Sequence, residues 1–357
     1  MNRYRPELNR RAALCGLVSS VLSLPALAQG PSRPLAHARG AIVPPNLAAR
    51  IQAQNRSSEA INRLLISSPE YSELLKSSNP FATPQTGTLP SKFDWRDSGR
   101  VTPVRRQSTC GSCWVFATTA AFESAYLIAA NQAASQQPIH VSEQQALDCA
   151  FAETGCDGGW HEVVCLYLNL LGAIGDDNYP YDEKDPRRGT CRGDVGNRPF
   201  WLANWGYVSG SIEIASDDAI KHALRAYGPL VTAVAATGEW DRYDKQVNPN
   251  WPTDFPNGVF RGTPTGNLKV SDINHEVVIV SWDDIRGVWL VKNSWGPDWG
   301  DQGYVNLSYG SDYIGFAASW LRAWPPAGPS ALFARLNSLV RQSEVLKFHP
   351  SLQLQLR

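Results

Sequence analysis

Two cysteines three positions apart could do chemistry within one short stretch of the chain. Residues 107–127 read QSTCGSCWVFATTAAFESAYL, so Cys110 and Cys113 are followed by an apolar run with helical spacing. A Cys-x-x-Cys pair can be a redox couple, half of a metal site, or one structural cysteine beside a reactive one. These interpretations predict three different functions, and residues further along the chain discriminate between them.

The first two interpretations find little support elsewhere in the sequence. A redox pair usually follows a buried strand, but RVTPVRRQST precedes Cys110 and is too polar for a central strand. A zinc site needs a second matched pair of ligands, and the chain has no second Cys-x-x-Cys and no His-x(3–5)-His. We therefore expect no metal site and no cofactor.

The third interpretation, a reactive thiol, has candidate partners. A catalytic thiol needs a base that forms the thiolate and donors for an oxyanion. Cys113 opens a predicted helix, whose positive end lowers the pKa of a thiol. His275 stands at the mouth of an apolar strand, and Asn293 follows eighteen residues later. The Asn293 carbonyl could orient the imidazole, and Trp295 could shield that hydrogen bond from water.

Seven stretches of the chain resemble, in order, motifs of the papain-like cysteine peptidases. They are DWRDSGRVTPVRRQ, CGSCWVFA, SEQQALDC, GCDGG, DNYPY, NHEVVIV and KNSWGPDWGDQGY, which cover roughly residues 89 to 320. The resemblance implies an α+β fold with a helical N-terminal lobe, a β-rich C-terminal lobe and the active site in the cleft between them. It also implies a cysteine endopeptidase that works through a thiolate–imidazolium pair and an acyl-enzyme.

The resemblance assigns a role to each catalytic candidate. Cys113 is the nucleophile, His275 the general base and acid, and Asn293 the residue that orients the imidazole. Gln107 gives its side-chain amide to the oxyanion hole, with the backbone N–H of Cys113 as the second donor. Ser108 stands where the family usually has glycine, so the geometry of this loop could differ from the family's.

The resemblance also implies two disulfides. Cys110 pairs with Cys156, and Cys149 pairs with Cys191, so the opening Cys-x-x-Cys holds one structural and one reactive sulfur. Cys165 has no counterpart in the family and is expected to be a buried free thiol in an apolar helix.

Substrate contacts carry over from the family as well. The residues assigned to substrate binding are Gly158, Gly159, Trp160, His161, Ile273, Asn274 and Trp295. Gly159 offers backbone hydrogen bonds to an extended peptide. The side chains around it predict an apolar or aromatic preference two residues before the scissile bond. A segment longer than usual, residues 239 to 272, is expected to border the cleft, and no His-rich insertion of an exopeptidase is present.

The elements that must position these residues change character along the chain. Helical spacing predicts helices within 46–75, 113–130, 142–149, 160–171 and 216–228, with Ser142 and Ser216 as caps. After Pro229 the runs LVTAVAA, HEVVIVSW, GVWLVKNSW and GYVNLSY predict short strands. The pattern is that of an α+β chain with two lobes.

The ends of the chain predict export and processing. Residues 1–28 have the basic, apolar and small-x-small order of a secretory signal, in a style typical of a bacterial one. Residues 29–88 are expected to be a removable pro-segment that inhibits the enzyme, with 29–45 loosely structured. The peptidase domain spans 89–324. The C-terminal extension, 325–357, is expected to pack on the body or to be partly disordered.

Composition narrows the partners and the compartment. The 357-residue chain is 43% hydrophobic and has 33 basic and 33 acidic residues, which argues against nucleic acid as a partner. We expect a secreted or periplasmic monomer, without a membrane span after signal removal, that acts on proteins or peptides. Two alternatives stay open: a catalytically weak relative that binds peptides, and a thiol-disulfide oxidoreductase that uses Cys110 and Cys113.

Overall fold

The computed structural model describes residues 37–69, 88–150, 155–184, 189–192, 197–324 and 331–350. The predicted signal, part of the predicted pro-segment and the last seven residues lie outside these ranges. Within them, every helix is too short or too polar to cross a lipid bilayer.

A buried helix organises the first half of the body. This helix, α3 (Cys113–Ala129), is buried along almost its whole length, as its apolar composition requires. The helices α4 (Glu143–Cys149) and α5 (His161–Leu170) pack beside it. Ser142 caps α4 by accepting a hydrogen bond from the backbone N–H of Gln145, as the sequence predicts.

The second half is a sheet of short strands. The strands are β1 (Lys92–Asp94), β2 (Leu202–Tyr207), β3 (Leu230–Val234), β4 (Val259–Phe260), β5 (His275–Asp283), β6 (Val288–Lys292), β7 (Tyr304–Ser308) and β8 (Phe316–Ala323). They follow the order β2-β8-β3-β5-β6-β7-β4, with β1 paired to β5. All pairs are antiparallel except β4 with β7.

Short helices connect and cover these strands. The α-helices are α6 (Asp217–Tyr227), α7 (Gly238–Arg242) and α8 (Trp251–Asp254). The 3₁₀ turns are η1 (Trp95–Ser98), η2 (Gly155–Asp157), η3 (Asp176–Asn178), η4 (Pro256–Gly258), η5 (Thr265–Asn267), η6 (Val270–Asp272) and η7 (Glu344–Phe348). Ser216 caps α6 through the backbone N–H of Ala219, so both predicted caps are present.

Two hydrophobic cores correspond to the two lobes that the sequence predicts. One core is formed around α3 and α5 and includes side chains of β2, such as Leu202 and Trp205. The other is rich in tryptophan and is formed by β5, β6, β7 and the segment around α7. Helix α3 packs against β5 and β8. Most of its buried apolar side chains, including Cys113, belong to the first core, and Ile128 near its C-terminal end belongs to the second.

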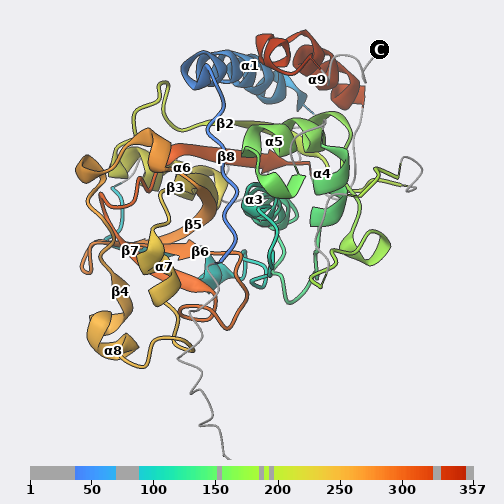
Figure 1. Cartoon of the computed structure of the whole chain (residues 1–357). Coiled ribbons are helices and arrows are strands. Elements are labelled where there is room, and N and C mark those ends of the chain that lie inside the picture. Colours follow the sequence, from blue (N-terminus) through green and yellow to red (C-terminus); the bar gives the residue numbers. More distant parts are fainter. Residues whose placement is uncertain are drawn as a thin grey trace, which may run out of the picture. The chain divides into compact units, whose positions relative to one another are not determined.

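The two ends of the described chain pack together on the helical side. Helix α1 (Leu47–Ser67) lies against β2, and α9 (Ala331–Gln342) and η7 pack on α1 (Figure 1). The expected apolar face of α1 is buried at Leu47, Ile51, Ile61 and Leu65. The C-terminal extension therefore packs on the body, as predicted for its helical part.

One expectation for the N-terminal region is wrong. Residues 29–45 are predicted to be loosely structured, yet residues 37–43 form an extended segment with backbone hydrogen bonds to two distant loops. We call residues 37–43 the N-terminal segment. Local composition, rich in Pro, Ala and Arg, carried no signal for these bonds because Gly159 and Asn274 lie more than a hundred residues away in the chain.

Candidate active site

Cys113 is the first residue of α3 and is fully buried. Its neighbour Cys110 is bonded to Cys156, and a second disulfide joins Cys149 to Cys191. Cys113 and Cys165 are free thiols. The structure thus forms both bridges that the family resemblance implies and leaves the candidate nucleophile unbonded at a helix N-terminus, where the helix dipole favours a thiolate.

His275 begins β5 and is held by Asn293, which follows β6. Its Nε2–H donates to Asn293 Oδ1 at 2.8 Å, because a carbonyl oxygen can only accept. Its Nδ1 is buried and has no hydrogen-bond partner among the described residues. The Trp295 ring lies 4.7 Å from the imidazole, centre to centre, and is itself buried. The free nitrogen is the one that could accept a proton from a thiol.

Gln107 is held by bonds from both ends of its side chain. Its Nε2 donates to Cys110 O at 2.7 Å, and its Oε1 accepts from Ser294 Oγ at 2.6 Å. The backbone N–H of Gln107 also donates to Ser294 O. These contacts tie the loop before α3 to the loop after Asn293. Ser108, next in the chain, adopts a left-handed conformation with φ of 54°.

The N-terminal segment covers this site. Ala38 O accepts from Gln107 Nε2 at 3.2 Å and from Trp295 Nε1 at 3.1 Å. The backbone N–H of Gly40 faces the sulfur of Cys113. The predicted oxyanion donor and the candidate nucleophile are therefore both occupied by backbone groups of the same chain.

The segment continues along the predicted substrate-binding backbone. Gly159 N donates to Gly40 O at 2.8 Å, and Ile42 N donates to Gly159 O at 2.9 Å, which forms a parallel bridge centred on Ala41. Ala41 N donates to Asn274 O at 2.9 Å. A Cβ on Gly158 would lie 2.6 Å from Gly40 O, so Gly158 permits this close approach.

Burial holds both candidate catalytic groups neutral in this covered form. Burial and, after it, the nearby carboxylate of Glu276 raise the pKa of the Cys113 thiol to about 12. Burial, against the opposing hydrogen bond with Asn293 and together with the positive charge of Arg39, lowers the pKa of His275 to about 3. A thiolate–imidazolium pair needs the opposite shifts, so the covered site stores a thiol and a neutral imidazole.

The side chains predicted to line a substrate pocket are buried: Trp160, His161 and Ile273 are 3%, 0% and 6% exposed. His161 is engaged within the protein, with Nδ1 2.9 Å from Glu276 Oε1 and Nε2 2.9 Å from Ser319 Oγ. The Oε2 of Glu276 is buried with no hydrogen-bond partner among the described residues. No sequence pattern indicates this pair, because Glu276 lies in an apolar strand pattern that predicts only core packing.

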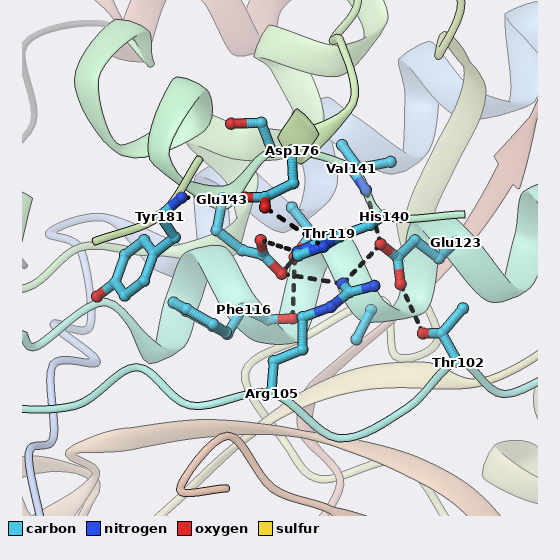
Figure 2. A network of polar contacts seen from close by, with 12 residues as sticks. Thr102, Arg105, Phe116, Thr119, Glu123, His140, Val141, Glu143, Asp176 and Tyr181 are labelled. Atoms are coloured by element: carbon cyan, nitrogen blue, oxygen red, sulfur yellow. Dashed lines mark hydrogen bonds and ion pairs between the residues drawn. The ribbon is translucent and has the colours of Figure 1, made fainter. Parts of the chain in front are cut away.

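A buried polar network around Arg105 joins α3 to α4 (Figure 2). Arg105 bridges two buried carboxylates, donating to Glu123 at 2.7 Å and to Glu143 at 3.1 Å. Thr102 donates to Glu123 and accepts from the Nζ of Lys292, the residue before Asn293. The network fixes the end of β6, and with it Asn293, relative to α3.

Among the described residues, one group of three has ligand atoms close enough to hold a metal ion, and it belongs to this network. They are His140, Glu143 and Asp176, with those atoms within 4.8 Å of one another. Both carboxylate oxygens of Glu143 are already bonded, one to Arg105 and one to His140. Arg105 supplies the positive charge that a metal would bring, so the cluster is an ion-pair network.

Trp240, within the 239–272 segment, is a further residue at the site that the sequence analysis did not single out. Its ring lies 6.3 Å from the imidazole of His275 and 6.2 Å from the ring of Trp295, measured between centres. Its Nε1 donates to the buried carboxylate of Asp312 at 3.0 Å. Through Trp240, the 239–272 segment therefore lies beside His275 and Trp295, at the border of the site.

Comparisons with known proteins agree with the motif series. The model of the papain family cysteine protease matches residues 89–323. The thiol protease aleurain-like of Arabidopsis thaliana is 36% identical over 236 residues, which are 64% of this chain and 59% of the relative. Pro-cathepsin H of Bos taurus is 34% identical over 239 residues, 65% of this chain and 64% of the relative.

A solved structure shows the same fold. Digestive procathepsin L 3 of Tenebrio molitor larval midgut superposes with a TM-score of 0.55 at 26% identity, over 77% of this chain and 88% of that one. These relatives are eukaryotic, and the chain spans about three-fifths of the length of the two curated ones. On the family match and this fold, the chain belongs to the papain family of cysteine proteases.

Proposed function

We propose that this chain hydrolyses peptide bonds as a cysteine endopeptidase with Cys113 as its nucleophile. The observation that carries the proposal is the arrangement of His275, whose Nε2–H is fixed on Asn293 while its Nδ1 is left without a partner. A free thiol at the N-terminus of α3 and an amide donor on Gln107 complete the groups that acyl transfer requires.

The chemistry follows from these groups. The proton of the Cys113 thiol moves to His275 Nδ1, and the sulfur attacks the carbonyl carbon of the peptide bond. The oxyanion accepts hydrogen bonds from Gln107 Nε2 and the backbone N–H of Cys113. The amine leaves with the proton from His275, which gives a thioester. Water, deprotonated by His275, then attacks the thioester, and the acid product and the thiol are released.

The two alternatives differ in their support. A thiol-disulfide oxidoreductase would need Cys110 for exchange with Cys113, but Cys110 is bonded to Cys156. A peptide-binding relative without catalysis would keep the groove but would have no use for a histidine oriented by Asn293. Endopeptidase rather than exopeptidase action rests on the sequence, and so does an apolar preference two residues before the scissile bond.

We also propose that the N-terminal segment, within the predicted pro-segment 29–88, inhibits the enzyme. Its backbone takes the Gln107 amide, faces the sulfur of Cys113 and pairs with Gly159. Gly40 makes this possible, since a Cβ there would lie 1.8 Å from Gly111 O. Any larger residue at position 40 must push the segment away from the site.

The test compares full-length chains on an unstructured protein substrate under mild reductant. We expect Gly40→Ala to raise hydrolysis at least about tenfold, and Cys113→Ala in that background to abolish it. Gly210→Ala is the matched control, because a Cβ at Gly210 meets open space. Equal, measurable rates of hydrolysis for wild type and Gly40→Ala would refute inhibition by the N-terminal segment and leave the peptidase function standing. No cleavage by folded Gly40→Ala would favour the peptide-binding alternative.

Secretion to the periplasm or the medium, through a bacterial-type signal, is the remaining part of the proposal. It rests on the order of basic, apolar and small residues in positions 1–28. Fractionation of a bacterial host that expresses the full chain, with intact-mass analysis, tests it. An exported product that begins after Ala28 supports export, and a cytoplasmic product that retains Met1 contradicts it.

A further inference from the structure

We infer that Asp241, Thr237 and Trp295 form a subsite for a guanidinium group on the leaving-group side of the scissile bond, so that the enzyme prefers substrates with arginine there. The inference rests on the proposed peptidase function and names a substrate class for it. Asp241 lies in α7, Thr237 is the residue directly before α7, and Trp295 lies in the loop after β6.

The subsite is occupied in the structure by Arg39 of the N-terminal segment. Arg39 donates to Asp241 Oδ2 at 3.0 Å and to the backbone carbonyl of Thr237 at 3.1 Å. Its guanidinium carbon lies 5.1 Å from the centre of the Trp295 ring. A carboxylate, a carbonyl and an aromatic face are the three partners that a planar guanidinium uses best.

A second residue of the segment contacts the same acidic surface. The backbone N–H of His37 donates to Asp241 Oδ1 at 3.2 Å, and the His37 ring stacks on Trp295 at 4.6 Å between centres. Its Nε2 lies 3.9 Å from Asp244 Oδ2. Asp241 therefore binds one backbone donor and one cationic side chain at once, as a substrate-binding carboxylate would.

The order of contacts along the segment places the subsite relative to the reaction. Gly40 faces Cys113, and the residues after it pair with Gly159, where the acyl part of a peptide is expected to bind. Residues 37–39 lie on the other side of Cys113, against Trp295 and α7. When the segment leaves, the carboxylate and the indole face become available on that side.

The surrounding charges favour a cation at this place. Arg106 is the other cation near His37, and it is already paired with Asp298 and with the carbonyl of Trp295. Among the contacts of the described residues, Asp241 and Asp244 have no cationic partner in the body. Their cationic partners are Arg39 and His37 of the N-terminal segment, and Asp244 also accepts the backbone N–H of Gln246 at 2.8 Å. Departure of the segment thus uncovers net negative charge.

The experiment uses the full chain with Arg39→Ala and Gly40→Ala, so that the occupant is absent and the segment is displaced. The substrates are internally quenched peptides with arginine or citrulline at each of the first three positions after the scissile bond. Citrulline has the same shape without the charge. Binding of the same peptides is measured by fluorescence anisotropy in a matching chain that also carries Cys113→Ala.

We expect kcat/KM and affinity to favour arginine about five- to tenfold at one position, since the pair is partly exposed and screened. Asp241→Asn should bring the ratio to about one, and Glu239→Gln, a neighbour paired with Arg242, should keep it. Equal use of arginine and citrulline overturns the subsite while the peptidase stands. Selective binding without cleavage supports the subsite and refutes the peptidase.

Discussion

At the residue scale, the site is defined by what each polar group has as a partner. The Nε2 of His275 bonds Asn293, and its buried Nδ1 has no hydrogen-bond partner among the described residues. The thiol of Cys113 is faced by backbone N–H groups, including that of Gly40. The same two side chains would form an ion pair once water and substrate reach them, because burial is the largest cause of both pKa shifts.

The reactivity of Cys113 should therefore depend on pH and on the segment. With the thiol pKa at about 12, the rate of Cys113 alkylation by iodoacetamide in the full chain should rise with pH and reach no plateau below pH 10. Gly40→Ala should speed alkylation at pH 6–7 by at least about tenfold. Peptide mass spectrometry distinguishes Cys113 from Cys165. Identical pH profiles of the two chains would contradict the role of burial.

Ser108 offers a second prediction at this scale. Its φ of 54° lies in the left-handed region, which costs a residue with a Cβ about 1–2 kcal/mol. Ser108→Gly should relieve this cost and raise the free energy of unfolding by about 0.5–1 kcal/mol, after the greater entropy of glycine in the unfolded chain is subtracted. Urea denaturation measures the change. Ser108→Ala is the control and should bring no such gain.

At the element scale, the end of β6 is held by a buried cation. Lys292 is 5% exposed, and its Nζ donates to the backbone carbonyl of Thr102 at 2.8 Å. Burial lowers its pKa to about 8, while the nearby Glu123 opposes that shift. Lys292 thereby anchors the end of β6 to Thr102 of the polar network in Figure 2. Asn293, which bonds His275, is the next residue in the chain.

This anchor predicts a pH dependence of stability. Between pH 8 and about 10.5 the unfolded chain retains a proton that folded Lys292 has released, so the free energy of unfolding gains up to about 3 kcal/mol as pH rises through this window. Lys292→Met should lack this gain. Denaturation of both chains at pH 8 and pH 10 measures the difference, and parallel behaviour would argue against a depressed lysine pKa.

At the scale of the whole molecule, the two ends of the described chain stabilise one another. Glu162 in α5 is fully buried and bonds Arg50 of α1 at 2.9 Å, Tyr207 of β2 at 3.0 Å and His349 after η7 at 2.5 Å. The apolar face of α9 is buried at Leu332, Leu336 and Val340. The C-terminal extension thereby holds α1, which follows directly on the N-terminal segment.

A chain that ends at Trp324 should lose this support. We expect Tm to fall by about 5 °C or more, and hydrolysis to rise because α1 and the segment are released more readily. Thermal unfolding and peptide hydrolysis measure the two effects. Glu344→Ala, which breaks only exposed pairs with Arg56 and Lys347, is the control and should change neither. If the truncated chain hydrolyses the peptide as slowly as the intact chain, α9 has no part in inhibition.

Much of the fold was predictable because its signals are local. Ser142 and Ser216 mark helix starts by their side-chain chemistry, and the apolar runs after Pro229 become strands where they were expected. The contacts of His161 were not predictable. Its position suggested a pocket wall, but Glu276 and Ser319 reach it from β5 and β8, and no sequence pattern encodes a pairing between strands and a helix so far apart.

The sequence by itself determined which residue types stand ready for thiol chemistry, the order of the family's motifs and the succession of helices and strands. These depend on side-chain chemistry and on periodicity over a few residues. Only the tertiary structure decided that residues 37–43 cover Cys113, that Arg39 meets Asp241, and that α9 packs on α1. Each of these contacts joins segments far apart in the chain, and their energies depend on burial and charge that exist only in the folded state.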